Sequence, residues 1–142
     1  MACDFQTQRR IEFADTDMAG IVHFSNFFRY MESAEHAFFR SLGLTLHTRE
    51  PGEMRGWARV DAQCEYLRPL IYQDLVQIRL WVVDKSASSL SYRFEFRTNG
   101  AEELSARGSL KVVHVARGPQ DQRMRAAIMP PEIDEKIQVA AP

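Results

Sequence analysis

Apolar residues recur at helical spacing along one stretch of the chain, from Phe27 to Leu42. Steps of three and four residues place side chains on one face of an α-helix, so this stretch predicts an amphipathic helix. Ser25 and Asn26 before it are favourable N-cap residues, and Gly43 after it is a favourable residue for ending a helix. The predicted apolar face carries Phe27, Phe28, Met31, Ala34, Phe38, Phe39 and Leu42. Such an aromatic face requires another surface to bury it.

Strict alternation of apolar and polar residues characterises the second half of the chain. Period two places successive side chains on opposite faces of a β-strand. In the first run we therefore expect Ala58, Val60, Ala62, Cys64 and Tyr66 to face the core, and Arg59, Asp61, Gln63 and Glu65 to face outward. Similar runs extend over residues 76–82, 90–96 and 104–112, and a weaker one over residues 5–13. Asn99-Gly100 predicts a tight hairpin, and the last four strands are expected to form an antiparallel meander.

The remaining segments show little periodicity. Residues 45–56 mix charged residues with Pro51 and Gly52, which predicts a surface connection. Near the end of the chain, Pro130-Pro131 precedes residues 132–139, where Ile133 and Ile137 indicate a short helix. His114 shares the parity of the inward row of its strand, and we interpret it as a buried core or interface histidine.

These elements predict an α+β fold in one domain covering residues 1–142, with a five-stranded antiparallel sheet wrapped around one long central helix. The outward positions of the strands include Trp81, Val83, Val113 and Val115. A sheet that leaves apolar side chains and a strand edge uncovered is expected to associate with further copies of itself. We therefore predict a homodimer or homotetramer.

Composition narrows the possible functions. The chain has 142 residues and a formal net charge of −1, which argues against a general nucleic-acid or membrane-surface partner. Its 2 cysteines, Cys3 and Cys64, form no metal-binding or disulfide pattern. The first residues lack a basic segment followed by an apolar one, and no run of apolar residues is long enough to span a bilayer. We expect a cytoplasmic protein without a cofactor.

A carboxylate-rich turn lies directly before the predicted helix, in the sequence Asp15-Thr16-Asp17-Met18-Ala19-Gly20. Backbone N–H groups at a helix N-terminus are free to bind an anion or a developing oxyanion. From the residues alone, Asp15 and Asp17 either shape the turn or carry chemistry. Asp15, Asp17 and His23 do not predict a metal site, because no further carboxylate or histidine follows at ligand spacing.

The same region resembles a known enzyme family. The run QRRIEFADTDMAGIV, from Gln8 to Val22, is followed by Asn26-Phe27 and by a helix that ends in Leu42-Gly43. It resembles the 4-hydroxybenzoyl-CoA thioesterase family and is similar to the acyl-CoA thioesterases associated with the Tol-Pal cluster. The resemblance implies the hotdog fold and hydrolysis of acyl-CoA or aroyl-CoA thioesters.

The resemblance also implies roles for particular residues. Asp17 would be the catalytic nucleophile or the general base on water, and the backbone N–H of Phe24 or of a neighbouring residue would polarise the thioester oxygen. The supporting residues of the loop would be Asp15, Gly20, His23 and Asn26. Gly20 would permit a turn that a side chain would block.

Two groups of polar residues are candidates for binding coenzyme A. Lys85 and Ser86 lie at a predicted turn, and Arg123 and Arg125 follow the Gly118-Pro119 turn. Arginine suits phosphate because it forms bidentate hydrogen bonds, although composition alone favours solvated turns for both groups. The resemblance implies that Arg125, together with Arg123, meets the phosphates of coenzyme A.

Three other functions remain open at this point. An acyl-carrier-protein thioesterase would keep Asp17 and dock an acidic partner on the arginines. A hotdog hydratase would use another Asp and His arrangement; Glu32, Glu35 and His36 are present, but Phe27 and the turn do not match it. A non-catalytic acyl-CoA-binding module would not need the intact Asp-Thr-Asp turn.

Overall fold

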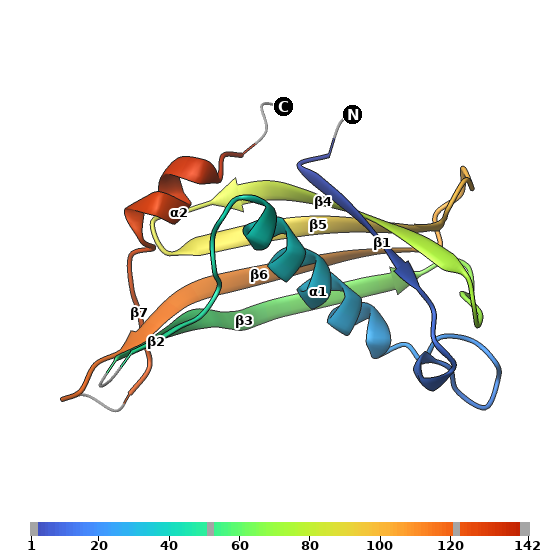
Figure 1. The fold of residues 1–142 in the computed structure, drawn as a ribbon, viewed down its shortest axis with the longest axis horizontal. Coiled ribbons are helices and arrows are strands. Elements are labelled where there is room, and N and C mark those ends of the chain that lie inside the picture. The colour runs from blue at the N-terminus through green and yellow to red at the C-terminus, as the bar shows by residue number, and fades with distance from the viewer. Residues whose placement is uncertain (1–2, 51–52, 121–122, 140–142) are drawn as a thin grey trace.

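A computed structural model describes residues 3–50, 53–120 and 123–139, and shows a curled antiparallel sheet with a helix across one face (Figure 1). The strands are β1 (Phe5–Arg10), β2 (Thr48–Glu50), β3 (Glu53–Tyr66), β4 (Leu75–Lys85), β5 (Ser89–Thr98), β6 (Ala106–Arg117) and β7 (Arg125–Ala126). The helices are α1 (Asn26–Ser41), α2 (Pro131–Lys136) and the short 3-10 helix η1 (Phe13–Asp15). All five predicted strands and both predicted α-helices are present.

The sheet has seven strands rather than the five predicted, in the order β1-β4-β5-β6-β3-β2, with β7 on β6. Both additional strands are short. β2 and the first residues of β3 fall within residues 45–56, so the predicted surface connection is wrong for these two strands. Pro51 and Gly52, which contributed to that prediction, lie outside the described residues. Met54 pairs with Arg117 of β6, so backbone pairing with a distant strand defines this segment, not side-chain periodicity.

The strand order also corrects the predicted meander. β4, β5 and β6 follow one another in the sheet, but β3 pairs with β6, and β1 takes the place beside β4. The turn at Asn99-Gly100 exists, with Gly100 at φ +86° and a hydrogen bond from Ala101 N–H to Thr98 O of 2.8 Å. It is not a tight hairpin, because residues 99–105 separate β5 from β6.

β1 is shorter than predicted. It ends at Arg10, and the chain then enters η1, where Phe13 is 76% exposed. Ile11 is buried in the core, as its position in the apolar pattern indicated. The prediction that Phe13 belongs to this strand is therefore wrong.

β3 contains a bulge that reverses part of the predicted pattern. The register shifts between Arg59 and Asp61, which places Arg59 opposite the buried Val112 and leaves Val60 56% exposed. Beyond the shift, Ala62, Cys64 and Tyr66 lie opposite Leu110, Gly108 and Ala106. A bulge adds one residue to a strand and so exchanges its two faces. The predicted inward direction of Val60 and outward direction of Arg59 are both wrong.

α1 begins and ends within one residue of the predicted helix. Its buried side chains are Phe27, Tyr30, Met31, Ala34, Glu35, Phe38 and Phe39. They pack on the inward residues of the sheet at close range: a Cβ at Gly108 of β6 would lie 2.1 Å from Met31 Cε. Glycine at this position lets the helix and the sheet approach each other.

α2 closes one end of the sheet. Ile133 and Ile137 are buried there, in agreement with the predicted short helix.

Trp81 was expected on an exposed outer face, yet it is only 4% exposed, with the Arg93 guanidinium 4.5 Å from the centre of its ring. His114 is buried, as predicted. Within the described residues, neither α-helix is long and apolar enough to cross a bilayer.

Candidate active site

The turn that carries Asp17 is held by its own backbone. Asp17 N–H donates to Ile21 O at 2.9 Å, and Gly20 N–H donates to Asp17 O at 3.0 Å. Gly20 has φ +83°, a conformation that residues with a side chain rarely adopt. The role expected for Gly20 in this turn therefore has a structural basis.

Asp17 places its carboxylate beside an apolar cavity. The cavity has a volume of about 480 Å³ and is lined by Asp17, Ile21, Val22, Phe24, Phe27, Tyr66, Leu67, Arg68, Pro69 and Leu70. Asp17 is half-buried, and its Oδ1 accepts a hydrogen bond from Ala19 N–H at 2.9 Å. Its Oδ2 accepts no hydrogen bond from the described residues.

Phe24 lies on the same cavity, just before the N-terminus of α1. Its carbonyl accepts a hydrogen bond from the Tyr66 hydroxyl at 2.9 Å. Its N–H donates to no acceptor among the described residues, whereas Ser25 N–H binds His23 Nδ1 and Asn26 N–H binds His23 O. The structure thus brings Asp17 and Phe24, both predicted from the sequence, to one cavity.

Asp15 and Asn26 join the turn to α1. The Asp15 carboxylate accepts Glu12 N–H at 2.9 Å, and the Asp15 carbonyl accepts both His23 N–H at 2.9 Å and Asn26 Nδ2–H at 2.8 Å. Ser25 occupies the N-cap position but forms no side-chain cap bond. The predicted side-chain cap is therefore absent, and the Asn26 side chain instead donates to the turn.

Among the described residues, the His23 side chain contacts only its neighbours Ser25 and Phe24. Its Nδ1 lies 2.8 Å from Ser25 Oγ, and its ring stacks on Phe24 with 4.6 Å between centroids.

Beneath the turn, the Arg9 guanidinium carbon lies 4.7 Å from the ring centre of the buried Tyr30. Burial, followed by the nearby Asp15 carboxylate, raises the pKa of Tyr30. Aromatic and charged groups thus support the turn from below.

The predicted coenzyme A residues lie away from Asp17 within one chain. Lys85 Nζ pairs with Asp134 at 2.8 Å, and Ser86 Oγ lies 2.5 Å from Ser89 Oγ, so both hold segments near α2. Arg125 belongs to β7, and it and Arg123 are exposed. Figure 1 shows α2 and β7 at the end of the sheet opposite the Asp17 turn. One chain does not bring the two predicted groups together.

A buried ionic group was not anticipated from the sequence. Glu35 of α1 is 0% exposed, and Arg59 Nη2 binds its Oε1 and also lies 3.3 Å from Glu32 Oε2. Burial raises the pKa of Glu35, and burial followed by the Glu35 charge raises the pKa of Tyr92. Strand alternation predicted Arg59 on the outer face, and only the bulge turns it toward the helix.

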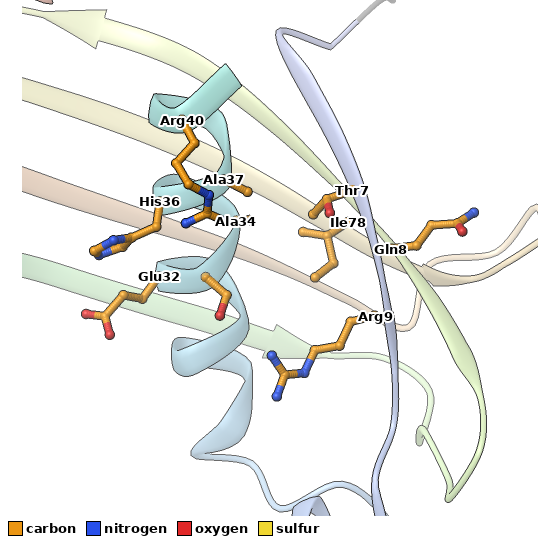
Figure 2. Close-up of a pocket in the computed structure, with 10 residues that line it drawn as sticks. Thr7, Gln8, Arg9, Glu32, Ala34, His36, Ala37, Arg40 and Ile78 are labelled. Carbon is orange, nitrogen blue, oxygen red and sulfur yellow. The ribbon is translucent and has the colours of Figure 1, made fainter. Parts of the chain in front are cut away.

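A second cavity lies between β1 and α1, with a volume of about 440 Å³. Figure 2 shows Arg9 reaching from β1 toward α1, with Glu32 and His36 on the other side of the helix. Burial, followed by the charge of His47, lowers the pKa of His36. This cavity is lined by many polar groups and does not include Asp17, so it offers less to an acyl chain.

Within the described residues, no group of three or more His, Cys, Asp and Glu residues could hold a metal ion.

Comparison with known proteins agrees with this geometry. A model of the thioesterase-like superfamily matches residues 11–137, which is most of the chain. The chain belongs to this superfamily. A 1,4-dihydroxy-2-naphthoyl-CoA hydrolase of Prochlorococcus marinus (strain NATL2A) is 30% identical over 119 residues, covering 79% of this chain and 74% of the relative.

Solved structures of similar proteins share the fold. A hypothetical protein of Aquifex aeolicus has a TM-score of 0.81 at 29% identity, covering 94% of this chain and 99% of its own. A 1,4-dihydroxy-2-naphthoyl-CoA thioesterase of Synechocystis has a TM-score of 0.80 at 23% identity, covering 93% of each chain. The hotdog-like thioesterase fold and the thioesterase class are therefore confirmed. The narrower 4-hydroxybenzoyl-CoA or Tol-Pal branch remains a prediction.

Proposed function

We propose that this thioesterase hydrolyses acyl-CoA or aroyl-CoA thioesters to free acid and coenzyme A, with Asp17 as its catalytic carboxylate. The observation that carries the proposal is the shared cavity: the Asp17 carboxylate and Phe24 both line an apolar space of about 480 Å³. Apolar walls suit an acyl or aroyl group. A carboxylate beside them is positioned to act on a bound carbonyl carbon.

Two routes use the same residues. As a general base, Asp17 takes a proton from water while the water oxygen attacks the thioester carbon; the carbon–sulfur bond breaks and the thiolate leaves to take up a proton. As a nucleophile, Asp17 attacks directly and expels the thiolate, and water then hydrolyses the mixed anhydride. In both routes Phe24 N–H donates to the oxygen that gains negative charge.

We further propose that coenzyme A is bound across two copies of the chain. Beyond its pairing with β2, β3 has an edge from Gly56 to Tyr66 that pairs with no strand among the described residues. An open edge of this kind favours pairing with another chain. Because antiparallel pairing of two β3 strands places the start of one beside the end of the other, the partner's β7 would approach the Asp17 turn. A homodimer, or a homotetramer built from it, would then supply Arg123 and Arg125 to the phosphates.

Lys85 and Ser86 belong to the same end of the sheet and are proposed as a secondary part of the coenzyme A site. Part of the hydrogen-bonding capacity of Lys85 and Ser86 is already used within the chain. Lys85 is 18% exposed as a side chain and is bound to Asp134, and Ser86 is bound to Ser89. The side chains of Arg123 and Arg125 are exposed.

A panel of coenzyme A thioesters tests the proposed function. Purified protein should release free thiol from at least one aliphatic or aromatic member, and a chelator should not change the rate. Carrier-protein thioesters of the same acyl groups belong in the panel. Faster turnover of those would favour a carrier-protein thioesterase, and no turnover of any member would favour a non-catalytic binding module.

The buried ionic group of Glu35 and Arg59 weighs against the hydratase alternative. Its candidate residues, Glu32 and Glu35, both contact Arg59, and Glu35 is fully buried. Glu35 is therefore not accessible to a substrate, whereas the Glu32 side chain is 57% exposed.

A further inference from the structure

The polar cavity between β1 and α1 has no role in the proposed hydrolysis. Its volume of about 440 Å³ lies within the range of about 300–1,000 Å³ that is typical of small-molecule sites. Ala34 and Ala37 line it from α1, and their small side chains leave space between the helix and the strand. Figure 2 shows Ala37 on the side of α1 that faces Thr7 of β1. The cavity therefore has room for a small ligand.

Two arginines from different elements line this cavity. Arg9 belongs to β1, and Arg40 belongs to the last turn of α1. Figure 2 shows Arg9 extending toward α1 and Arg40 running back along the helix. Among the described residues, neither guanidinium forms an ion pair with a carboxylate. The cavity thus contains two cations whose charge is not balanced by a direct partner.

The Arg9 side chain also has an unused hydrogen-bond donor. Its Nε is buried and has no acceptor among the described residues. A buried donor without an acceptor is costly, and a bound anion would supply one. The hydroxyl-bearing residues Thr7 and Ser33 line the same cavity and add further possible donors.

Glu32 is the one carboxylate residue among the described residues that line the cavity. Its Oε2 lies 3.3 Å from Arg59 Nη2, outside the cavity lining. Figure 2 shows Glu32 on the opposite side of α1 from Arg9. The space between the helix and β1 therefore favours a negatively charged ligand.

We propose that this cavity is a second ligand site, which binds a phosphorylated small molecule through Arg9 and Arg40. The planar guanidinium group donates parallel hydrogen bonds to two oxygens of one phosphate, and a phosphate has further oxygens for hydroxyl donors. The phosphate belongs either to the nucleotide end of coenzyme A or to a free phosphorylated molecule. Neither Arg123 nor Arg125 lines this cavity, so the site is distinct from the one proposed above for coenzyme A.

The position of the cavity in the sheet is compatible with the proposed association of two chains. β1 ends the strand order on one side, and β3 and β2 end it on the other. Pairing of two chains through β3 therefore takes place at the opposite edge of the sheet from β1. The proposed phosphate site does not depend on that pairing.

Titration calorimetry at constant ionic strength tests the site, with pyrophosphate and adenosine 3′,5′-bisphosphate as probes and sodium chloride as the control for nonspecific charge. The wild type should bind at least one probe. Arg9→Met and Arg40→Met keep an apolar stem and should each weaken binding about tenfold to a hundredfold, as expected for loss of a charge-assisted contact. Arg29→Met is the matched control and should not change binding, because Arg29 is exposed on the same helix and does not line the cavity.

A second variant separates ligand binding from stability. Arg40 lies in the last turn of α1, where a cation also interacts favourably with the helix dipole, so its loss is expected to lower the thermal midpoint slightly. Ala37→Leu retains both arginines and the helix but fills the space between α1 and β1. It should abolish binding of the probe while the protein stays folded, which its thermal midpoint shows.

The order of affinities identifies the source of the phosphate. Tighter binding of adenosine 3′,5′-bisphosphate indicates the nucleotide end of coenzyme A, and tighter binding of pyrophosphate indicates a free phosphorylated molecule. Three results would overturn the proposal: no binding of either probe, equal weakening by Arg29→Met and Arg40→Met, or unchanged binding in a folded Ala37→Leu variant. No thioester is used in these titrations, so their failure leaves the proposed hydrolysis intact, and absence of turnover leaves this site intact.

Discussion

Two carboxylates near α1 have opposite surroundings: Asp17 lies in the turn before the helix, and Glu35 lies within it. Asp17 is half-buried in a turn beside an apolar cavity, and one of its carboxylate oxygens accepts a hydrogen bond from Ala19 N–H. Glu35 is completely buried, and Arg59 binds it across from β3. Both residues are acidic, so residue type alone does not distinguish their roles. The cavity beside Asp17 is the basis of the proposal that Asp17 is catalytic, whereas burial with a cation indicates a structural role for Glu35.

The largest expected effect is on activity at Asp17. Asp17→Asn removes the ionised carboxylate and keeps the size of the side chain, so kcat for a coenzyme A thioester should fall by about 10²-fold or more. Asp15→Asn is the matched control, because it retains an oxygen to accept Glu12 N–H. Its loss should be less than about tenfold, as expected for one neutral hydrogen bond. Larger loss at Asp15 than at Asp17 would reverse the assignment.

The next effect concerns stability at Glu35. Arg59→Met keeps an apolar stem but leaves Glu35 buried without its cation, which should lower the free energy of unfolding by about 3 kcal/mol. Urea denaturation measures this change. At temperatures where the variant stays folded, kcat should equal that of the wild type, because Arg59 does not line the Asp17 cavity.

Arg107→Met provides the control for Arg59. Its guanidinium pairs with Glu65 at 3.2 Å, but the two side chains are 52% and 61% exposed. Exposed pairs of this kind contribute about 0–1 kcal/mol. Equal destabilisation by both substitutions would remove the distinction between the buried and the exposed pair.

A smaller effect is expected at the far end of the sheet. Arg125→Ala should raise KM for coenzyme A thioesters about tenfold to a hundredfold with little change in kcat, because a charge-assisted contact to phosphate is remote from the reacting carbon. An acyl-pantetheine substrate has no nucleotide, and its KM should not respond. If KM for both substrates rises equally, Arg125 acts through structure and the phosphate assignment fails.

The smallest expected effect is a pH dependence of stability. Burial raises the pKa of Glu35, so between its ordinary and its raised pKa the folded protein retains a proton that the unfolded chain has lost. The contribution of Glu35 to stability is therefore greatest below the ordinary pKa and declines as pH rises through this window. Glu35→Gln cannot ionise, so its free energy of unfolding relative to the wild type should increase with pH. A difference that does not vary with pH would show that Glu35 has no raised pKa.

Local patterns predicted local structure well. The apolar spacing of α1 located the helix to within a residue at each end, and the Asp-Thr-Asp turn was recognisable because Gly20 and the helix N-terminus lie within a few residues of it. Asp17 and Phe24 belong to one short segment and line the same cavity. Predicting that these two residues lie near each other did not require the order of the strands in the sheet.

Features that depend on distant pairing were not predictable in the same way. The bulge at Arg59 exchanges the faces of β3, and no residue near it signals the extra position. β2 and the first part of β3 lack alternation because they are defined by pairing with each other and, for β3, with β6. Trp81 is buried although its parity is outward, because Arg93 of the next strand covers its ring. Each case depends on a neighbour that the local pattern does not contain.

The most direct test of the account is a structure of the Asp17→Asn variant with an acyl-CoA bound. We predict that the acyl group fills the cavity beside residue 17, with the thioester oxygen about 2.7–3.1 Å from Phe24 N. An acyl group seated between β1 and α1, or a carbonyl out of reach of Phe24 N–H, would contradict the assignment of this cavity as the active site.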